Sequence, residues 1–439
     1  MQLDLNVSLI LSELILIVIA CFILVASLFY KFDLKALKGL SILALILALV
    51  CKISTDSYMQ SFFGLFIYDD LAKYSSILIY LSAIYFLLAN KRADEGEFFA
   101  LFLMMISCLS FMVSTNNLIV AFITLEGSSL ALYSLIAFKK KAIDGALKYF
   151  NYGMLGSAFF AMGSAMYYFD SASLELRTLQ VVSTAGVLSF VMVGLTILFK
   201  LSIAPLHMWL KDVYVKADSS LAGFISIVPK IAMMVFAFRF ISSFDNFFNV
   251  SEIVLIIACI SMLFASIMSL KQDNAKLMLV YSSVSHSSFA YSTLAFVDLS
   301  ASMFLYYFLT FAFVNIALFM FLGAFKDSSY DNLQGVFKKY PLLGICIVIL
   351  LLNLAALPPF GVFFAKVGVI NIALHVNIYA AICMAVSSII MLFAYLRFIK
   401  AIFADKEIGF LYFNNAQKIA FVLAVIASFV ASLGLDYIS

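Results

Sequence analysis

The stretch that decides the fold reads LTILFKLSIAPLHMWLKDVYVKADSS and spans residues 195–220. Lys200 stands inside an apolar run, five residues before Pro205, and His207 follows the proline. A proline removes a backbone donor and interrupts a helix, and a lysine in hydrocarbon is costly. The stretch therefore predicts a membrane helix that is broken beside a buried charge.

The composition extends this interpretation to the whole chain. Of its 439 residues, 65% are hydrophobic and 12% are charged, whereas soluble domains are about half apolar and about a quarter charged. No polar stretch is long enough to form a soluble domain. The six cysteines are scattered, and the three histidines show no metal-ligand spacing, so we expect no metal site and no cofactor in this chain.

Apolar segments of about 20 residues can span a bilayer as helices, and the chain contains fourteen of them. Two are broken by proline, 182–214 at Pro205 and 341–376 at the LPPFG motif of residues 357–361. The fold class is therefore an all-α polytopic membrane protein with about fourteen transmembrane helices. The predicted spans are 8–30, 36–54, 71–90, 96–114, 116–138, 143–169, 182–214, 220–242, 252–270, 275–296, 300–325, 341–376, 378–403 and 416–436.

The basic residues predict the orientation. Most of the 27 lysines and arginines fall in alternate loops, beginning with Lys31, Lys35 and Lys38, while the other loops hold few, namely Lys52, Lys73 and Arg177. Loops rich in lysine and arginine remain on the cytoplasmic side. We therefore expect both termini on the outer side of the membrane.

Several ionisable side chains lie at membrane depth. Glu126, Lys230 and His286 are near the middle of their spans, and Lys200 and Lys366 lie beside the two breaks. A charge at the bilayer centre costs about 2.5–3.5 kcal/mol on insertion scales. Burial lowers the pKa of a lysine and a nearby carboxylate raises it, so such residues can exchange protons. The pattern favours a proton relay.

Structural explanations remain open beside the relay. Lys148 and Arg239 are close enough to helix ends to extend toward the interface. Glu126 and Lys200 can form a pair that only fixes packing, and a lone histidine such as His207 or His286 can be a polar packing residue.

Lys200 and Lys366 also suggest an internal repeat. Each lies in a broken span, and these spans are the seventh and the twelfth, which are five apart in the order. A tandem repeat of five spans must be inverted because five is odd, and paired broken helices in inverted repeats point to a transport site. We expect three N-terminal spans in 1–95, two inverted five-helix repeats in 96–242 and 252–403, and a last helix in 404–439.

The chain resembles the antiporter-like membrane subunits of respiratory complex I. The motifs that carry the resemblance follow the family order over residues 96–403. They are TLEGSSLALYSLIAF around Glu126, FKLSIAPLHMWLKDVY around Lys200, IVPKIA around Lys230, QDNAKLMLVYSSVSHSSFAY around His286 and LNLAALPPFGVFFAKVGVI around Lys366. The short end after the last helix and the lysine at 366 resemble the N-type branch of that family.

The resemblance implies that Glu126, Lys200, Lys230, Lys366 and His286 transfer protons along a polar axis, and we add His207 as a candidate. It implies a proton-translocating subunit of NADH–quinone oxidoreductase in a bacterial inner membrane, assembled with other membrane-arm subunits and binding no nucleic acid. NADH or another donor, FMN, iron–sulfur clusters and quinone would be used by other subunits. A sodium/proton antiporter subunit, a membrane-bound hydrogenase subunit and a scaffold are the alternatives.

Overall fold

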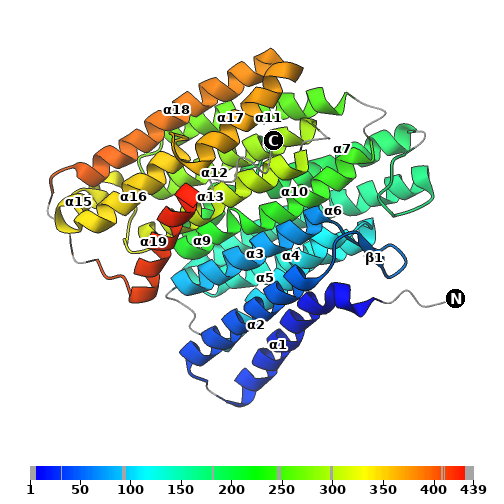
Figure 1. The fold of residues 1–439 in the computed structure, drawn as a ribbon, viewed down its shortest axis with the longest axis horizontal. Coiled ribbons are helices and arrows are strands. Elements are labelled where there is room, and N and C mark those ends of the chain that lie inside the picture. Colours follow the sequence, from blue (N-terminus) through cyan, green and yellow to red (C-terminus); the bar gives the residue numbers. More distant parts are fainter. Residues whose placement is uncertain are drawn as a thin grey trace. The chain divides into compact units, whose positions relative to one another are not determined.

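The computed structural model describes residues 6–30, 32–90, 95–179, 182–244, 249–296, 300–406, 409 and 411–430. Helices dominate these residues (Figure 1). The first half contains α1 (Leu11–Phe29), α2 (Leu34–Ser54), α3 (Asp70–Ala89), α4 (Gly96–Ser114), α5 (Leu118–Ala137), α6 (Ile143–Ser171), α7 (Thr184–Leu201), α8 (Trp209–Lys216), α9 (Ser219–Ile225) and α10 (Val228–Ser242).

The second half continues with longer and shorter helices. They are α11 (Val250–Leu270), α12 (Ala275–Ser292), α13 (Ser300–Leu322), α14 (Tyr330–Leu333), α15 (Val336–Lys339), α16 (Pro341–Leu354), α17 (Gly361–Val376), α18 (Ile378–Phe403) and α19 (Asn415–Val430). Three short 3₁₀ turns cover Val7–Ile10, Lys140–Ala142 and Thr293–Ala295. Strands β1 (Met59–Ser61) and β2 (Phe66–Tyr68) form an antiparallel hairpin between α2 and α3.

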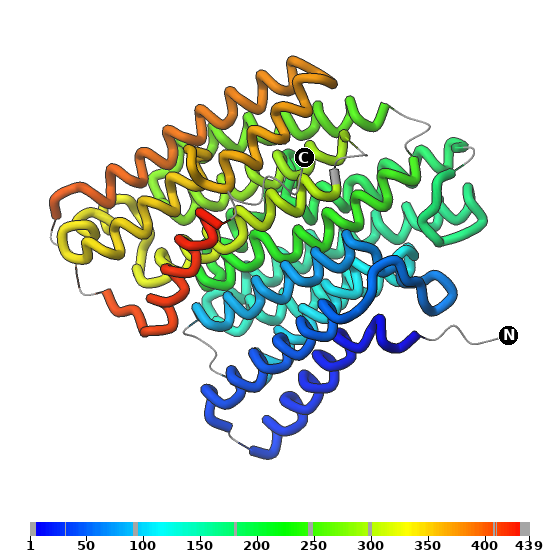
Figure 2. Tube along the Cα trace, in the orientation of Figure 1, coloured from blue at the N-terminus to red at the C-terminus, as the bar shows by residue number. Residues whose placement is uncertain are grey.

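The chain divides into two packing units. The first holds residues 1–87, 91–201 and 228–250, and the second holds 88–90, 202–227 and 251–439. In the first unit α4 packs on α1, α5 and α10, and α6 packs between α5 and α7. In the second unit α13 is central and packs on α9, α12, α16, α17 and α19. Figure 2 shows α19 against α16 within this unit.

The predicted membrane helices are confirmed as helical segments. Each of the fourteen predicted spans contains helix in its described part. Among the described residues, ten helices are long and apolar enough to cross a membrane, and the count of fourteen crossings stays a prediction. Residues 431–436 of the last predicted span lie outside the described residues. The inverted five-helix repeat also stays a prediction.

Both predicted helix breaks are present and resemble each other. The helices before the breaks, α7 and α16, are followed by Ser202 with φ 63° and Ala356 with φ 55°, a left-handed conformation that ends a helix. The Ala204–Pro205 and Pro358–Pro359 peptide bonds are cis.

Buried side chains satisfy the backbone around the breaks. Ser261 accepts a hydrogen bond from the Ala204 N–H at 2.9 Å, and Asn353 accepts one from the Val362 N–H at 3.1 Å. Irregular backbone at membrane depth requires such partners because no water is available in hydrocarbon.

The structure adds one break that the sequence analysis missed. The predicted continuous span 220–242 is two helices, α9 and α10, joined by the turn at residues 226–227. Pro229 follows the turn, and a proline is well tolerated in the first turn of a helix. Lys230 therefore lies in the first turn of α10 and not within an uninterrupted helix.

The prediction that Lys52 lies in an outer loop was wrong. Lys52 belongs to the last turn of α2 and is 1% exposed. Its ammonium lies 2.7 Å from the carboxylate of Glu13 on α1, which is equally buried. The loop assignment failed because Lys52 is close to the end of its span in the sequence, and its pairing with the Glu13 carboxylate in the first span was not considered.

Candidate functional site

Glu126 and Lys200 lie on neighbouring elements of the first packing unit. Glu126 is on α5, and Lys200 is in the last turn of α7, just before the break. The Lys200 ammonium donates a hydrogen bond to Ser129 Oγ at 2.7 Å, and Ser157 on α6 donates one to Glu126. A carboxylate and an ammonium on neighbouring elements attract each other, but each takes a serine as its hydrogen-bond partner. The predicted pair is therefore a serine-flanked electrostatic pair.

The surroundings of the Lys200 ammonium are mostly aromatic. The rings of Tyr133 and Phe199 each have their centroid 6.0 Å from Nζ. An ammonium over aromatic faces is attracted weakly and needs no counter-ion in direct contact. When Lys200 loses its proton the attraction to the two rings is lost, but the hydrogen bond between its Nζ and Ser129 Oγ can remain, because a neutral amine also forms hydrogen bonds.

Lys230 belongs to the same unit as Glu126 and Lys200. It is 1% exposed on α10, a helix that packs on α4 and α7. Its depth confirms the prediction that this lysine is buried. Its role in proton transfer stays a prediction.

His286 lies in the second unit at the centre of a chain of hydrogen bonds. Its Nδ1 is 2.7 Å from the hydroxyl of Tyr307 on α13, and its Nε2 is 3.0 Å from the hydroxyl of Tyr395 on α18. The Tyr395 hydroxyl is also hydrogen-bonded to Ser282, one turn before His286 on α12. All four side chains are buried.

Such an arrangement can pass a proton through the imidazole. In neutral imidazole one ring nitrogen donates and the other accepts. A proton can pass when Tyr307 donates to Nδ1 and is reprotonated in turn, the ring gives its Nε2 proton to Tyr395, and Tyr395 gives its own proton to Ser282. Because both nitrogens have hydroxyl partners, both tautomers and the protonated ring are satisfied.

Lys366 is in the same unit, on α17 directly after the second break. It is 3% exposed, and its ammonium lies 4.8 Å from the centroid of the Phe289 ring. That ring stacks on Tyr307 with centroids 6.2 Å apart. The Phe289 ring therefore connects Lys366 to Tyr307, which is one end of the hydrogen-bonded chain around His286.

His207 is less well connected than the other candidates. It lies in the loop after Pro205, where its ring packs on Phe264 with centroids 4.7 Å apart and on Tyr281 at 6.2 Å. Its Nδ1 is buried without a hydrogen-bond partner among the described residues. Aromatic packing accounts for its position, and a proton-transfer role stays a prediction.

Sequence reasoning missed the hydroxyl groups that connect these residues. Ser129 is one turn from Glu126, and the spacing of three residues on one helix was a usable signal. Ser157, Tyr307 and Tyr395 come from other helices. No pattern within a single segment identifies them, because contacts between helices are not encoded in local spacing.

The chain is similar over most of its length to known membrane subunits. The profile of the family described as "NADH:quinone oxidoreductase/Mrp antiporter, TM" matches residues 115–393. The NADH-quinone oxidoreductase subunit N of Campylobacter lari is 36% identical, with 93% of each chain covered. That of Campylobacter jejuni is 37% identical, with 90% of this chain and 89% of the relative covered.

Solved structures show the same fold. A chain of respiratory complex I from Thermus thermophilus with bound aureothin superposes with a TM-score of 0.87 at 25% identity, and 97% of each chain is covered. A chain of an archaeal membrane-bound sulfane sulfur reductase superposes with a TM-score of 0.88 at 20% identity, covering 97% of this chain and 94% of that one. The second likeness concerns the fold alone.

Proposed function

The chain belongs to the NADH:quinone oxidoreductase/Mrp antiporter transmembrane family and, within it, to the N subunits of NADH-quinone oxidoreductase, and we propose that it transfers protons across the membrane through its buried charges. It is a multi-pass all-α membrane protein. Its work is done as a membrane-arm subunit of complex I, in which electrons pass from NADH to quinone in other chains.

The observation that carries the proposal is the arrangement around Glu126 and Lys200. A carboxylate and an ammonium at membrane depth attract each other, yet each is held by a serine hydroxyl. A buried pair that serves packing alone gains most from direct, fully hydrogen-bonded contact. A separated pair can instead change protonation at either member without breaking a direct ion pair, which suits a relay.

The second packing unit supports the same function with different chemistry. There the hydrogen-bonded chain Ser282–Tyr395–His286–Tyr307 supplies a route for a proton. The Lys366 ammonium lies over the Phe289 ring, which stacks on Tyr307 at one end of that route. We propose that Lys230 and His207 extend these routes toward the helix breaks.

The remaining parts of the proposal follow from the family and the loop charges. The protein resides in a bacterial inner membrane with both termini on the outer side, and its partners are the other membrane-arm subunits, including related antiporter-like ones. NADH or another donor, flavin, iron–sulfur clusters and quinone belong to other subunits. Exchange of sodium for protons is the second candidate because the family also contains Mrp antiporters. The lysine-rich buried set favours protons, because a sodium site requires clustered oxygen ligands.

The proposal is tested by Glu126→Gln in the assembled complex. Glutamine keeps the volume and can still accept the Ser157 hydrogen bond, but it cannot bind and release a proton. We expect normal assembly and a loss of quinone-coupled proton pumping of about tenfold or more, the scale of a lost acid–base group. Glu97→Gln, at the half-exposed start of α4, is the matched control and should pump normally. Parental pumping by a fully assembled Glu126→Gln complex would contradict the proposal.

A further inference from the structure

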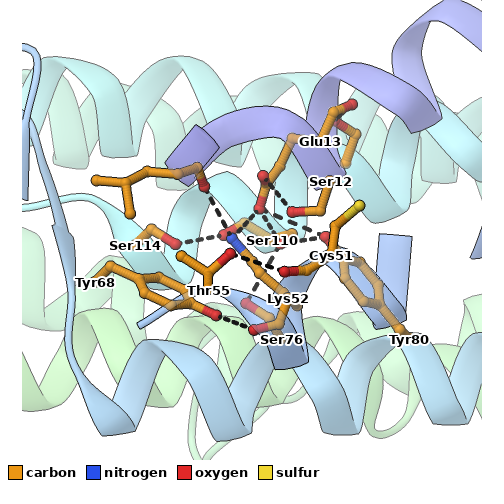
Figure 3. A network of polar contacts seen from close by, with 12 residues as sticks. Ser12, Glu13, Cys51, Lys52, Thr55, Tyr68, Ser76, Tyr80, Ser110 and Ser114 are labelled. Carbon is orange, nitrogen blue, oxygen red and sulfur yellow. Dashed lines mark hydrogen bonds and ion pairs between the residues drawn. The ribbon is translucent and has the colours of Figure 1, made fainter. Parts of the chain in front are cut away.

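A second buried ion pair lies among the N-terminal helices, far in sequence from the residues of the proposed relay. Glu13 on α1 and Lys52 on α2 are each 1% exposed, and Lys52 Nζ is 2.7 Å from Glu13 Oε1 (Figure 3). The start of α1 and the end of α2 lie together, because Glu13 is in the first turn of α1 and Lys52 is in the last turn of α2. The strand hairpin covers that end, where the hydroxyl of Tyr68 donates to the Lys52 carbonyl at 2.8 Å.

The Glu13 carboxylate is surrounded by hydroxyl groups. Ser110 on α4 donates to Oε1 at 2.5 Å, Ser12 donates to Oε2 at 2.7 Å, and the Tyr80 hydroxyl lies 3.5 Å from Oε1. The network continues beyond the carboxylate, because Tyr80 donates to Ser110 at 2.7 Å and Ser110 lies 3.4 Å from Ser76 (Figure 3).

Hydroxyl partners allow two protonation states of one carboxyl group. A hydroxyl both donates and accepts. When Glu13 is ionised, the serines donate to it. When Glu13 is protonated at Oε2, its O–H can donate to Ser12, whose own hydroxyl turns away. Each protonation state of Glu13 is therefore hydrogen-bonded. Backbone N–H groups or an arginine could not serve both states, because they only donate and cannot accept from a protonated carboxyl group.

Lys52 keeps partners when Glu13 is neutral. Its ammonium lies 3.4 Å from the Leu9 carbonyl oxygen and 4.7 Å from the centroid of the Tyr68 ring. A carbonyl oxygen and an aromatic face both stabilise an ammonium. Lys52 therefore keeps stabilising contacts when Glu13 is protonated. A buried pair is strongly destabilised by neutralising one member only when the other charge is left without partners.

Among the residues that the structure describes, three other titratable side chains lie around Glu13. They are Lys52 from α2, Tyr80 from α3 and Tyr68 from β2, while α4 contributes the hydroxyls of Ser107 and Ser110. Burial and the Glu13 carboxylate raise the pKa of the Tyr68 phenol, so Tyr68 remains a neutral hydrogen-bond donor. The group that can change its charge in this cluster without losing its partners is Glu13.

We propose that Glu13 is a further proton-binding site of this chain, which takes up and releases a proton near the membrane face that carries the strand hairpin. A proton from water at that face adds to a carboxylate oxygen, the charge of Glu13 changes from minus one to zero, and release reverses the step. By the predicted orientation this face is the outer one. The inference rests on the proposed proton function of the chain.

The first test observes the carboxyl group directly in the assembled complex. Infrared difference spectra between acidic and alkaline conditions should contain the carbonyl stretch of a protonated carboxylic acid. The component of this band that comes from Glu13 should be missing in Glu13→Gln and present in Glu252→Gln, which changes an exposed carboxyl group at the start of α11. Ser110→Ala keeps both charges and should shift the band, because it removes a hydrogen bond to Glu13. Spectra that are unchanged in Glu13→Gln and Ser110→Ala would overturn the inference.

The second test distinguishes proton binding at Glu13 from a purely structural ion pair between α1 and α2. Glu13→Gln combined with Lys52→Met removes both charges at similar volume, so no charge is left unpaired and assembly should survive. We expect the proton pumping of this double variant to fall by about tenfold. Parental pumping by the assembled double variant, with pumping lost in Lys200→Ala in the same assay, would identify a fixed ion pair and overturn this inference alone. Parental pumping by both variants would also overturn the proposed function.

Discussion

The hydroxyl of Tyr395 is the best place to interrupt a relay through His286, because this one oxygen atom connects His286 with Ser282 in the hydrogen-bonded chain. It hydrogen-bonds His286 Nε2 at 3.0 Å and also contacts Ser282. Tyr395→Phe removes this oxygen and leaves the ring, which is fully buried. The change therefore interrupts the route between Ser282 and His286 with little effect on packing.

The structural cost of this change is limited. Leaving a buried hydrogen-bonding group without its partner costs about 1–3 kcal/mol, which is small against the total stability of a folded chain, about 5–15 kcal/mol. The functional cost is larger if protons pass through the hydroxyl, since a positioned acid–base group contributes about a hundredfold or more. We therefore expect a fully assembled complex whose proton pumping falls by about tenfold or more.

The assay measures proton pumping driven by quinone reduction in sealed vesicles, together with the amount of assembled complex. Tyr291→Phe is a matched control because it removes a buried hydroxyl from the same helix as His286, outside the hydrogen-bonded chain. Tyr307→Phe should reproduce the loss. If Tyr395→Phe pumped as well as Tyr291→Phe at equal assembly, the reasoning that His286 works through its tyrosine partners would be refuted.

Three further predictions concern stability and topology. Arg239→Ala breaks the 2.8 Å ion pair between Arg239 and Asp69, in which the two side chains are 9% and 27% exposed, and it should lower the free energy of unfolding by about 1–3 kcal/mol. Lys338→Ala is the control, because it breaks an exposed pair with Asp405 and should have little effect in the same thermal unfolding assay. Gly153→Ala places a methyl group 1.9 Å from the Tyr133 hydroxyl and should cost about 1–3 kcal/mol through overpacking; Gly194→Ala meets open space, so equal melting temperatures would contradict the packing described here. Cysteines at Thr178 and Lys326, both exposed, should be labelled from opposite faces of the membrane, and labelling of both from one side would show the orientation to be wrong.

Much of the fold could be predicted because hydrocarbon imposes simple rules on a sequence. Length and apolarity located the long helices but not the short helices α14 and α15, which lie between two predicted spans, and the prolines at 205 and 358–359 located two breaks. The break before Lys230 was missed because the apolar run continues through residues 226–227, although Pro229, in the middle of the predicted span 220–242, was a usable signal. Depth counting correctly placed Lys230 and His286 in buried positions, and Lys366 beside the second break is buried as well. Glu126, which was also counted to the middle of its span, is half-buried.

The partners of the buried charges could not be predicted in the same way. Glu13 and Lys52 are 39 positions apart, and their pairing depends on how α1 and α2 meet. The same holds for Tyr395, which reaches His286 from a helix 109 residues away. An acidic residue in the first apolar segment, LSELIL at 11–16, was nevertheless a visible signal, since a carboxylate at membrane depth requires a partner.

The most direct test of proton transfer by this chain is the pumping activity of a fully assembled Lys200→Arg complex. Arginine keeps the positive charge beside Ser129 and Glu126, so a lysine that serves packing alone is replaced with little loss. A guanidinium does not release its proton at any usable pH, so a lysine that exchanges protons is not replaced. We predict that Lys200→Arg pumps nearly as poorly as Lys200→Ala. Pumping at the parental rate by the assembled Lys200→Arg complex would contradict the proposed role of Lys200.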